Sequence, residues 1–394
     1  MSETTPELVT PGLATAHEPS GRPQLVDTQS LVFWLFVGVV AFSGLHLFHW
    51  VTANPLVAPA IAWLAIVQWV IYAGIFLVVV YRHQLFVKRP LSLTFAAMAW
   101  GGVVAMWFSI EADQVLESIF TQVISPEWND GWGLAVSGAT NEEILKALGL
   151  VVLVLLPLAR VKSSLDGLYY GMMVGLGFQL VEDYTYTVGQ STTTDEVLGF
   201  LYLRGLVAGL WAHAVYTGIV GFGIGYLVTR RDRPMAARIG VAVGLFAFAW
   251  TMHFVWDSPI LVDWGERSSP AFYTTILLKG LPALVVLLVI LRWGRGRERT
   301  DWNEFVEQHI DPSLVPADDC VALLDRRGRK AARRAARASG GRTAGRTQHH
   351  LQNAQLRYVQ SVMEEGADSE RAQALAADIR ELQSWASAVG EPAR

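Results

Sequence analysis

Three charged side chains lie inside a segment that is otherwise apolar enough to cross a membrane. The stretch 137–150, SGATNEEILKALGL, contains Glu142, Glu143 and Lys146. A charged side chain at the centre of a bilayer costs about 2.5–3.5 kcal/mol, so the three without partners would cost on the order of 8 kcal/mol. On a helix, Lys146 lies one turn beyond both glutamates and can pair with either of them. Because one ammonium cannot neutralise two carboxylates, the second carboxylate requires a proton, a metal ion or another cation.

Further ionisable residues occur in three later apolar segments, as the pairs Glu182 and Asp183, Arg204 and His213, and His253 and Asp257. Their distances from the segment ends place Glu182, His213 and His253 in the same half of the bilayer as Glu142. His253 and Asp257 share a helix face, so the carboxylate can hold the second nitrogen of the imidazole. Asp183 is expected to face water or to cap a helix end. Arg204 is expected to extend its guanidinium to the interface, with pairing to a carboxylate as the alternative.

Two carboxylates and two imidazoles around one cavity suit the activation of a water molecule. A carboxylate removes a proton from water as a general base. We predict as catalytic residues Glu142, Glu143, His253 and Asp257, with the choice of base between the two glutamates left open. The activation of water is expected with or without a bound divalent ion. Histidine and glutamate ligands match a zinc site with an open fourth position, and the predicted ligands of such an ion are Glu143, Glu182, His213 and His253. The expected reaction is hydrolysis of an amide bond inside the membrane, in a hydrated pocket open to the outside.

The elements that would position these residues are long apolar segments. The chain has 394 residues, of which 52% are hydrophobic and 17% charged, and its mean hydropathy is +0.33. This composition predicts an all-α polytopic membrane protein with about eight transmembrane helices. The segments lie at 31–50, 55–80, 91–110, 134–158, 167–186, 198–229, 236–257 and 271–292. The sixth is too long for one straight span and is rich in glycine, so it predicts an interrupted helix.

The connecting loops predict the orientation of the chain. Thirteen basic residues follow the second, fourth, sixth and eighth segments, whereas the opposite loops contain only Arg267. The positive-inside rule therefore places both termini in the cytoplasm of a multi-pass protein in the cytoplasmic (inner) membrane. The loop 111–133 is expected to face outward and to contain a short amphipathic helix.

We expect three regions: a polar cytosolic tail at 1–30, an intramembrane domain at 31–292 and a basic, helical cytosolic region at 293–394. Nine Lys and Arg residues at 326–346 predict contact with anionic lipid head groups, with a plain solvated helix as the alternative and no specific nucleic acid expected. A helical pattern follows at 350–388. The single cysteine, Cys320, excludes a disulfide framework and a cysteine-rich zinc site.

Three motifs in three separate segments resemble the PrsW family of bacterial intramembrane proteases, distant relatives of the CAAX prenyl endopeptidases and the Abi proteins. EEILK at 142–146 matches E-E-x-x-K, FQLVE at 178–182 matches F-x-x-x-E, and HFVWD at 253–257 matches H-x-x-x-D. The second motif ends in Glu182, as in PrsW, whereas the wider group has a histidine there. His213, in HAVYTGIVGFGIG, resembles the additional histidine motif of the family.

The resemblance covers about residues 30–292. It implies supporting roles for Lys146 and Phe178, and cleavage of a single-span membrane protein, such as an anti-sigma factor, near the outer face of the membrane. A proton- or ion-coupled transporter with a relay of intramembrane Glu and His is the main alternative. Transporters commonly contain inverted repeats with matching broken helices, and only one segment of this chain is predicted to be broken. A receptor or scaffold would leave the buried carboxylates unexplained.

Overall fold

The structure, a computed structural model, describes residues 29–53, 58–82, 89–155, 161–324 and 326–390. All regular secondary structure in these ranges is helical, which confirms the predicted all-α class. The chain divides into two compact units, Leu25–Asn303 and a second unit that contains Glu304–Arg394. The predicted N-terminal tail at 1–30 falls almost entirely outside the described residues.

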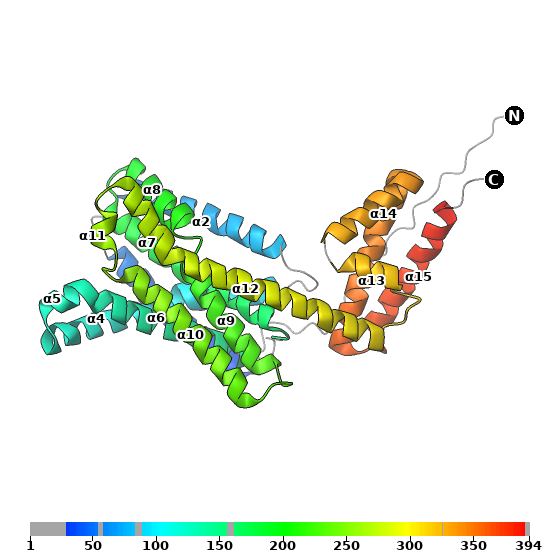
Figure 1. Cartoon of the computed structure of the whole chain (residues 1–394), viewed down its shortest axis with the longest axis horizontal. Helices are drawn as coiled ribbons and strands as arrows, with labels where there is room; N and C mark the ends of the chain where they lie inside the picture. Colours follow the sequence, from blue (N-terminus) through cyan, green and yellow to red (C-terminus); the bar gives the residue numbers. More distant parts are fainter. Residues whose placement is uncertain (1–28, 54–57, 83–88, 156–160, 325, 391–394) are drawn as a thin grey trace. The chain divides into compact units, whose positions relative to one another are not determined.

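The larger unit is built from long helices joined by short connections (Figure 1). Its helices are α1 (Leu31–Thr52), α2 (Pro59–Arg82), α3 (Leu91–Ala99), η1 (Trp100–Ala105), α4 (Met106–Val123), α5 (Pro126–Trp128), η2 (Asn129–Gly133), α6 (Leu134–Leu155), α7 (Ser164–Gln190), α8 (Thr194–Phe200), η3 (Leu201–Val207), α9 (His213–Thr229), α10 (Met235–Asp257), α11 (Val262–Gly265) and α12 (Ser269–His309). The elements written η are wider π-helical turns within or between α-helices.

The chain is a multi-pass membrane protein. Within the described residues, five helical stretches are long and apolar enough to cross a bilayer: Leu31–Thr52, Pro59–Arg82, Leu91–Val123, Met235–Asp257 and Ser269–His309. The helices α6 and α7 contain the ionisable residues noted above, and α9 is apolar but only 17 residues long. The predicted total of eight spans stays a prediction.

The sixth apolar segment is broken, as predicted. The π-helix η3 ends at Val207, and α9 begins only at His213, after Ala212 adopts φ −81° and ψ −149°. Irregular backbone at membrane depth is tolerated where it is buried in protein or lines a hydrated cavity. Within the break, Ala208 and Trp211 are buried. The break therefore places His213 at the start of a helix inside the protein.

The third apolar segment extends further than predicted. The elements α3, η1 and α4 form one helical stretch from Leu91 to Val123, so the predicted outward loop at 111–133 begins as helix. Asn141 of α6 donates a hydrogen bond of 3.1 Å to Asp113 of α4, and this bond ties the polar extension to a neighbouring helix. A side-chain partner of this kind stabilises helix where hydropathy alone predicts its end.

Glycines bring the backbones of α7 and α9 into direct contact. A Cβ on Gly167 would collide with the carbonyl of Gly221, one on Gly171 with that of Thr217, and one on Gly175 with that of His213. Small residues one turn apart allow this close approach between helices in membranes. The register of the two helices is thus fixed by main-chain atoms, and it sets the position of His213 relative to α7.

Replacing Gly175 with alanine should test this contact. Because the new methyl group meets the carbonyl of His213, we expect Gly175→Ala to lower the free energy of unfolding by about 1–3 kcal/mol. The measurement is unfolding of the purified protein in detergent. Gly189→Ala on the same helix is the control, because a Cβ there meets nothing within 4 Å; equal losses of stability would contradict the assignment.

The smaller unit contains α13 (Ala317–Leu323), α14 (Arg326–Glu365) and α15 (Glu370–Gly390). Helix α14 is two helices joined at Gly340 and Gly341, where Gly341 adopts φ 73° and interrupts the helical conformation. Its second half and α15 account for the helical pattern predicted at 350–388. The core of this unit is apolar and includes Leu323, Leu351, Tyr358, Val359 and Ile379.

Candidate active site

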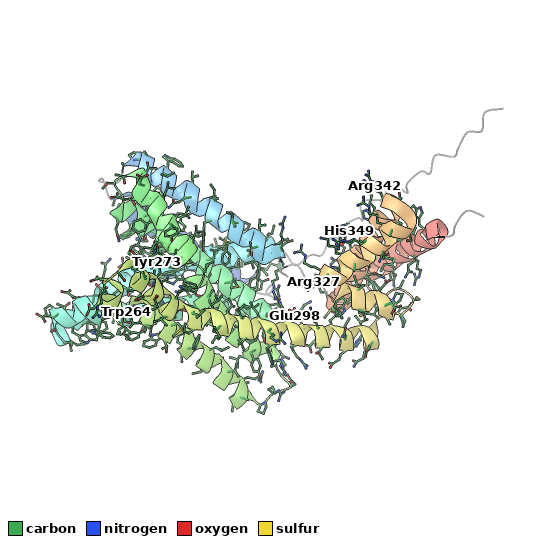
Figure 2. The ribbon with its side chains drawn as sticks, turned by 45° about the horizontal axis from the view of Figure 1, so that its top comes forward. Trp264, Tyr273, Glu298, Arg327, Arg342 and His349 are labelled. Carbon is green, nitrogen blue, oxygen red and sulfur yellow. The ribbon has the colours of Figure 1, made fainter. Side chains whose placement is uncertain are left out.

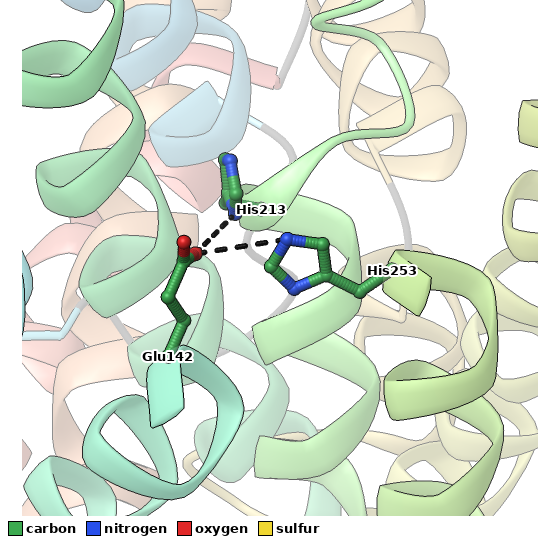
Figure 3. Close-up of side chains that lie close together, drawn as sticks. All are labelled: Glu142, His213 and His253. Carbon is green, nitrogen blue, oxygen red and sulfur yellow. Dashed lines mark ion pairs between the residues drawn. The ribbon is translucent and has the colours of Figure 1, made fainter. Parts of the chain in front are cut away.

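The centre of the site is a carboxylate that lies between two imidazoles. Glu142 Oε2 is 3.6 Å from His213 Nδ1 and 3.7 Å from His253 Nε2. Each residue comes from a different helix, α6, α9 and α10 respectively, and Figure 3 shows the three side chains pointing toward one another. All three residues are buried. The structure thus brings together residues that are separated by up to 111 positions in the sequence, from 142 to 253.

In each imidazole, the nitrogen that faces away from Glu142 contacts a second carboxylate. His213 Nε2 is 2.8 Å from Glu182 Oε2 of α7, and His253 Nδ1 is 3.0 Å from Glu143 Oε1. Because a carboxylate accepts, these two nitrogens donate and carry the proton. His213 Nδ1 is then left as an acceptor, whereas His253 Nε2 faces two carboxylates and can accept only where a metal ion replaces its proton. Asp257 Oδ2 is 3.1 Å from His253 Nε2, so it shares this nitrogen with Glu142.

Lys146 is the buried cation of the site. Its Nζ lies 2.7 Å from Glu143 Oε1 and 3.3 Å from Glu142 Oε2, and it is 3.0 Å from His213 Nδ1. The ammonium also sits 4.4 Å from the centre of the Phe178 ring, whose π-face favours a cation. Lys146 and Glu143 are both fully buried. The lysine therefore pairs with both glutamates, as the spacing predicts, and the second carboxylate gains a histidine as a further partner.

Arg204 and Asp183 lie deeper in the protein than predicted. Asp183 is only 1% exposed and pairs with Arg204 Nε, so the prediction that it faces water or caps a helix end is wrong. Arg204 also reaches Glu182 Oε2 at 2.7 Å and covers the ring of Tyr186 at 4.3 Å, instead of extending to the interface. The reason is electrostatic. Two adjacent carboxylates inside a membrane require a cation, and this need outweighs the cost of partly burying the guanidinium.

Tyr216 is a neighbour of the site that the motifs do not identify. Its ring stacks on His253 with a centroid distance of 5.7 Å. Its hydroxyl is buried and has no hydrogen-bond partner among the described residues. Tyr216 follows His213 by three positions on α9 and so lies on the same helix face. That spacing is the signal that would have found it.

Gly138 leaves a small space beside Glu142, into which one methyl group would fit without a clash. Gly138 lies one turn before Glu142 on α6, and a Cβ there would be 3.5 Å from Glu142 Oε1 and 3.9 Å from Asp257 Oδ2. The two oxygens of Glu142 therefore face different surroundings: Oε2 faces the histidines and Oε1 faces this space. The Asp257 side chain is 24% exposed, against 9% for Glu142 and 2% for His253. Asp257 is therefore the most accessible of these three side chains.

The residues fit a divalent metal ion. Glu142, His213 and His253 each offer one ligand atom, and these atoms lie within 4.8 Å of one another. A tetrahedral ion with bonds of 2.0–2.1 Å separates its ligand atoms by about 3.3–3.4 Å, close to the two distances above. The connected side chains include five carboxylates but only two permanent cations, Lys146 and Arg204. A divalent cation would reduce this excess of negative charge.

This group contains one residue outside the predicted ligand set and lacks two of its members. Glu142 belongs to the central group, whereas Glu143 and Glu182 bind the far nitrogens of the two histidines. Carboxylates in that outer position orient metal-binding imidazoles in many proteins. With a metal ion on the three central atoms, Lys146 would keep Glu143 as its ion-pair partner and the ring of Phe178 as a neighbour.

Arg204 orients one of these outer carboxylates, and its loss should weaken metal binding. We expect Arg204→Gln to reduce the affinity for a divalent ion by at least about 10-fold, because Glu182 no longer holds His213 in place. Titration of the purified protein with zinc measures the effect. Arg204→Lys keeps the charge and should lose less affinity, and Arg267→Gln in an exposed turn is the control. An unchanged affinity in Arg204→Gln would show that Glu182 orients His213 without the arginine.

Comparison with protein families gives one match. The model described as PrsW family intramembrane metalloprotease matches residues 89–291, just over half of the chain. The matched region contains Glu142, Glu182, His213 and His253. No curated protein and no solved structure matches the chain.

Proposed function

The chain belongs to the PrsW family of intramembrane metalloproteases, and from this premise we propose that it cuts a single-span membrane protein near the outer face of the membrane, with Glu142 as the general base. It is therefore a hydrolase of the membrane. The observation that supports the detailed proposal is the group formed by Glu142, His213 and His253, three buried polar side chains from three helices around one point.

Glu142 suits the role of base better than Glu143. Glu143 is fully buried and both Lys146 and His253 bind its Oε1, so a substrate has no path to it. Glu142 Oε1 faces the space beside Gly138. In the proposed reaction this oxygen takes a proton from water while the water oxygen attacks the carbonyl carbon of the scissile bond. As the C–N bond breaks, the same carboxyl group gives its proton to the leaving amine.

The other residues hold the reacting groups in position. Asp257 and Glu143 fix the ring of His253. Glu182 and Arg204 fix His213 in the same way. We propose zinc as the metal and Glu142 Oε2, His213 Nδ1 and His253 Nε2 as its ligands. When bound, such an ion supplies positive charge that polarises water and the substrate carbonyl.

The proposed depth of the site follows from the helices that carry it. Glu142 lies eight residues after the first residue of α6, Leu134, which is roughly 12 Å along the helix. The asymmetry of basic residues in the loops supports cytoplasmic termini and a location in the cytoplasmic membrane. In that orientation, the start of α6 and the end of α10 lie on the outer side. In the same proposal, residues 31–292 form the intramembrane domain and residues 293–394 form the cytosolic region.

The proposed substrate is a protein with one transmembrane helix, such as an anti-sigma factor. We propose that the substrate reaches Glu142 as an extended stretch of backbone rather than as an intact helix, because Glu142 is buried and a helix is about 10 Å wide. A bond near the outer end of the substrate helix reaches this depth after a short stretch has unwound.

Reconstitution with candidate substrates tests the proposal. The protein is placed in vesicles with tagged single-span proteins, and products are mapped by mass spectrometry for wild type, His253→Ala and the exposed control His49→Ala. We expect wild type and His49→Ala, but not His253→Ala, to cut near the outer end of the substrate helix. We also expect wild type and His49→Ala to bind about one zinc ion per chain. No cleavage of any substrate, together with an ion flux that depends on Glu142, would favour a transporter instead.

A further inference from the structure

One cavity of the smaller unit is lined almost entirely by basic side chains. It has a volume of about 620 Å³, and six Lys and Arg residues line it: Lys330, Arg333, Arg334, Arg337, Arg342 and Arg346. His349 and His350 complete the polar lining, and none of the described lining residues is acidic. The volume is in the usual range for binding sites of small molecules.

The cavity exists because α14 folds back on itself. Gly340 and Gly341 break the helix, and Gly341 adopts a φ of 73°, which glycine tolerates best. The two halves then lie antiparallel: Arg333 donates a hydrogen bond of 2.8 Å to His349 Nδ1, and Gln352 donates one of 3.2 Å to the carbonyl of Arg329. Figure 2 labels Arg342 and His349 on this part of the chain. The fold therefore gathers basic residues from both halves around one space.

This concentration of like charge is unfavourable without a counter-ion. Several of the lining side chains, including Arg337, Arg342 and Arg346, are exposed and available to a ligand. Partial burial and the guanidinium of Arg333 lower the pKa of His349. The planar guanidinium groups present paired N–H donors that match the oxygens of a phosphate group.

We propose that this cavity binds an anion that carries two or more phosphate groups. A single phosphate would leave most of the six basic side chains without a partner, whereas a chain or pair of phosphates can contact both halves of α14. The same chemistry occurs in soluble polyphosphates and in the head group of a lipid with two phosphates, such as cardiolipin. The proposal is independent of the protease site, because it involves none of its residues.

Binding to the full-length protein in detergent tests the proposal. Inorganic tripolyphosphate is titrated at constant salt by calorimetry, and short-chain cardiolipin is titrated in a second arm. We expect micromolar binding of at least one probe and a loss of 10-fold or more in the variant Arg337→Gln/Arg346→Gln. The control is Arg326→Gln/Arg327→Gln, which removes the same charge from the same helix outside the lining; we expect less than a 3-fold change.

The pattern of binding separates the sources and can overturn the proposal. Tripolyphosphate binding alone indicates a soluble ligand, and cardiolipin binding alone indicates a lipid. No binding of either probe, or an equal loss in the two double variants, would show a dispersed basic surface without a site. Arg337→Lys keeps the charge but loses the paired donors. It should weaken binding several-fold, which tests the site even if the double variant fails to fold.

Discussion

Replacement of Glu142 with glutamine is expected to reduce the rate of substrate cleavage by about 1000-fold, within the range that general-base catalysis contributes. Glutamine keeps the shape of the side chain but cannot take a proton from water. Lys146 retains Glu143 Oε1 at 2.7 Å in this variant, so we expect a folded protein that still binds substrate. The readout is the initial rate of cleavage in vesicles at saturating substrate.

Two matched variants interpret that result. Glu111→Gln makes the same change at an exposed position of α4 and should leave the rate unchanged. Glu143→Gln removes the carboxylate that both Lys146 and His253 use, and we expect it to lower stability as well as activity. If Glu142→Gln cleaved at more than a tenth of the wild-type rate while a folded Glu143→Gln variant did not cleave, Glu143 would be the base.

Replacement of Lys146 with methionine is expected to lower the free energy of unfolding by about 3–5 kcal/mol, because it leaves buried carboxylates without their cation. Glu143 would lose the most, because its side chain is fully buried and its Oε1 lies 2.7 Å from Lys146 Nζ. Unfolding of the purified protein in mixed micelles measures the loss.

A double-mutant cycle separates this pair from a general packing effect. In Lys146→Met/Glu143→Gln both charges are absent, so we expect part of the lost stability to return and a coupling energy of at least about 1 kcal/mol. The pair Lys146→Met/Glu111→Gln should be additive, because Glu111 lies on the exposed side of another helix. Additive effects in both pairs would exclude a specific interaction between Lys146 and Glu143.

Local helical spacing accounts for the contacts that could be predicted from the sequence. The pairs Glu142 with Lys146 and His253 with Asp257 are each four residues apart, and the structure places them at 3.3 Å and 3.1 Å. Such contacts depend only on the geometry of one helix. The glycine-rich sixth segment, likewise, contains its own signal for a break.

Contacts between helices could not be predicted in the same way. Glu142 and Glu143 are adjacent, so the rotation of α6 decides which of them lies between the two histidines, and that rotation depends on packing against other helices. The same reason explains Asp183, which turns inward because Arg204 approaches from η3. Both residues can be read from the sequence, but the close approach of η3 to α7 that brings them together cannot.

The helices that carry the proposed catalytic residues differ in how much of their surface is buried in the protein. Main-chain contacts at three glycines hold α7 against α9. In α10 only Ala249 and His253 are buried, and its close contact with α9, between Ala242 and Gly223, lies about three turns before His253. We therefore expect a substrate in the bilayer to enter through a lateral gate that opens when α10 swings away from α6, taking His253 and Asp257 with it. Catalysis would begin only after the gate closes. Thr140 and Trp250 are joined by a 3.1 Å hydrogen bond from the indole of Trp250, so a short bifunctional thiol cross-linker between Thr140→Cys and Trp250→Cys should block entry. Cleavage at the wild-type rate by the cross-linked protein would show that the substrate does not enter between α6 and α10.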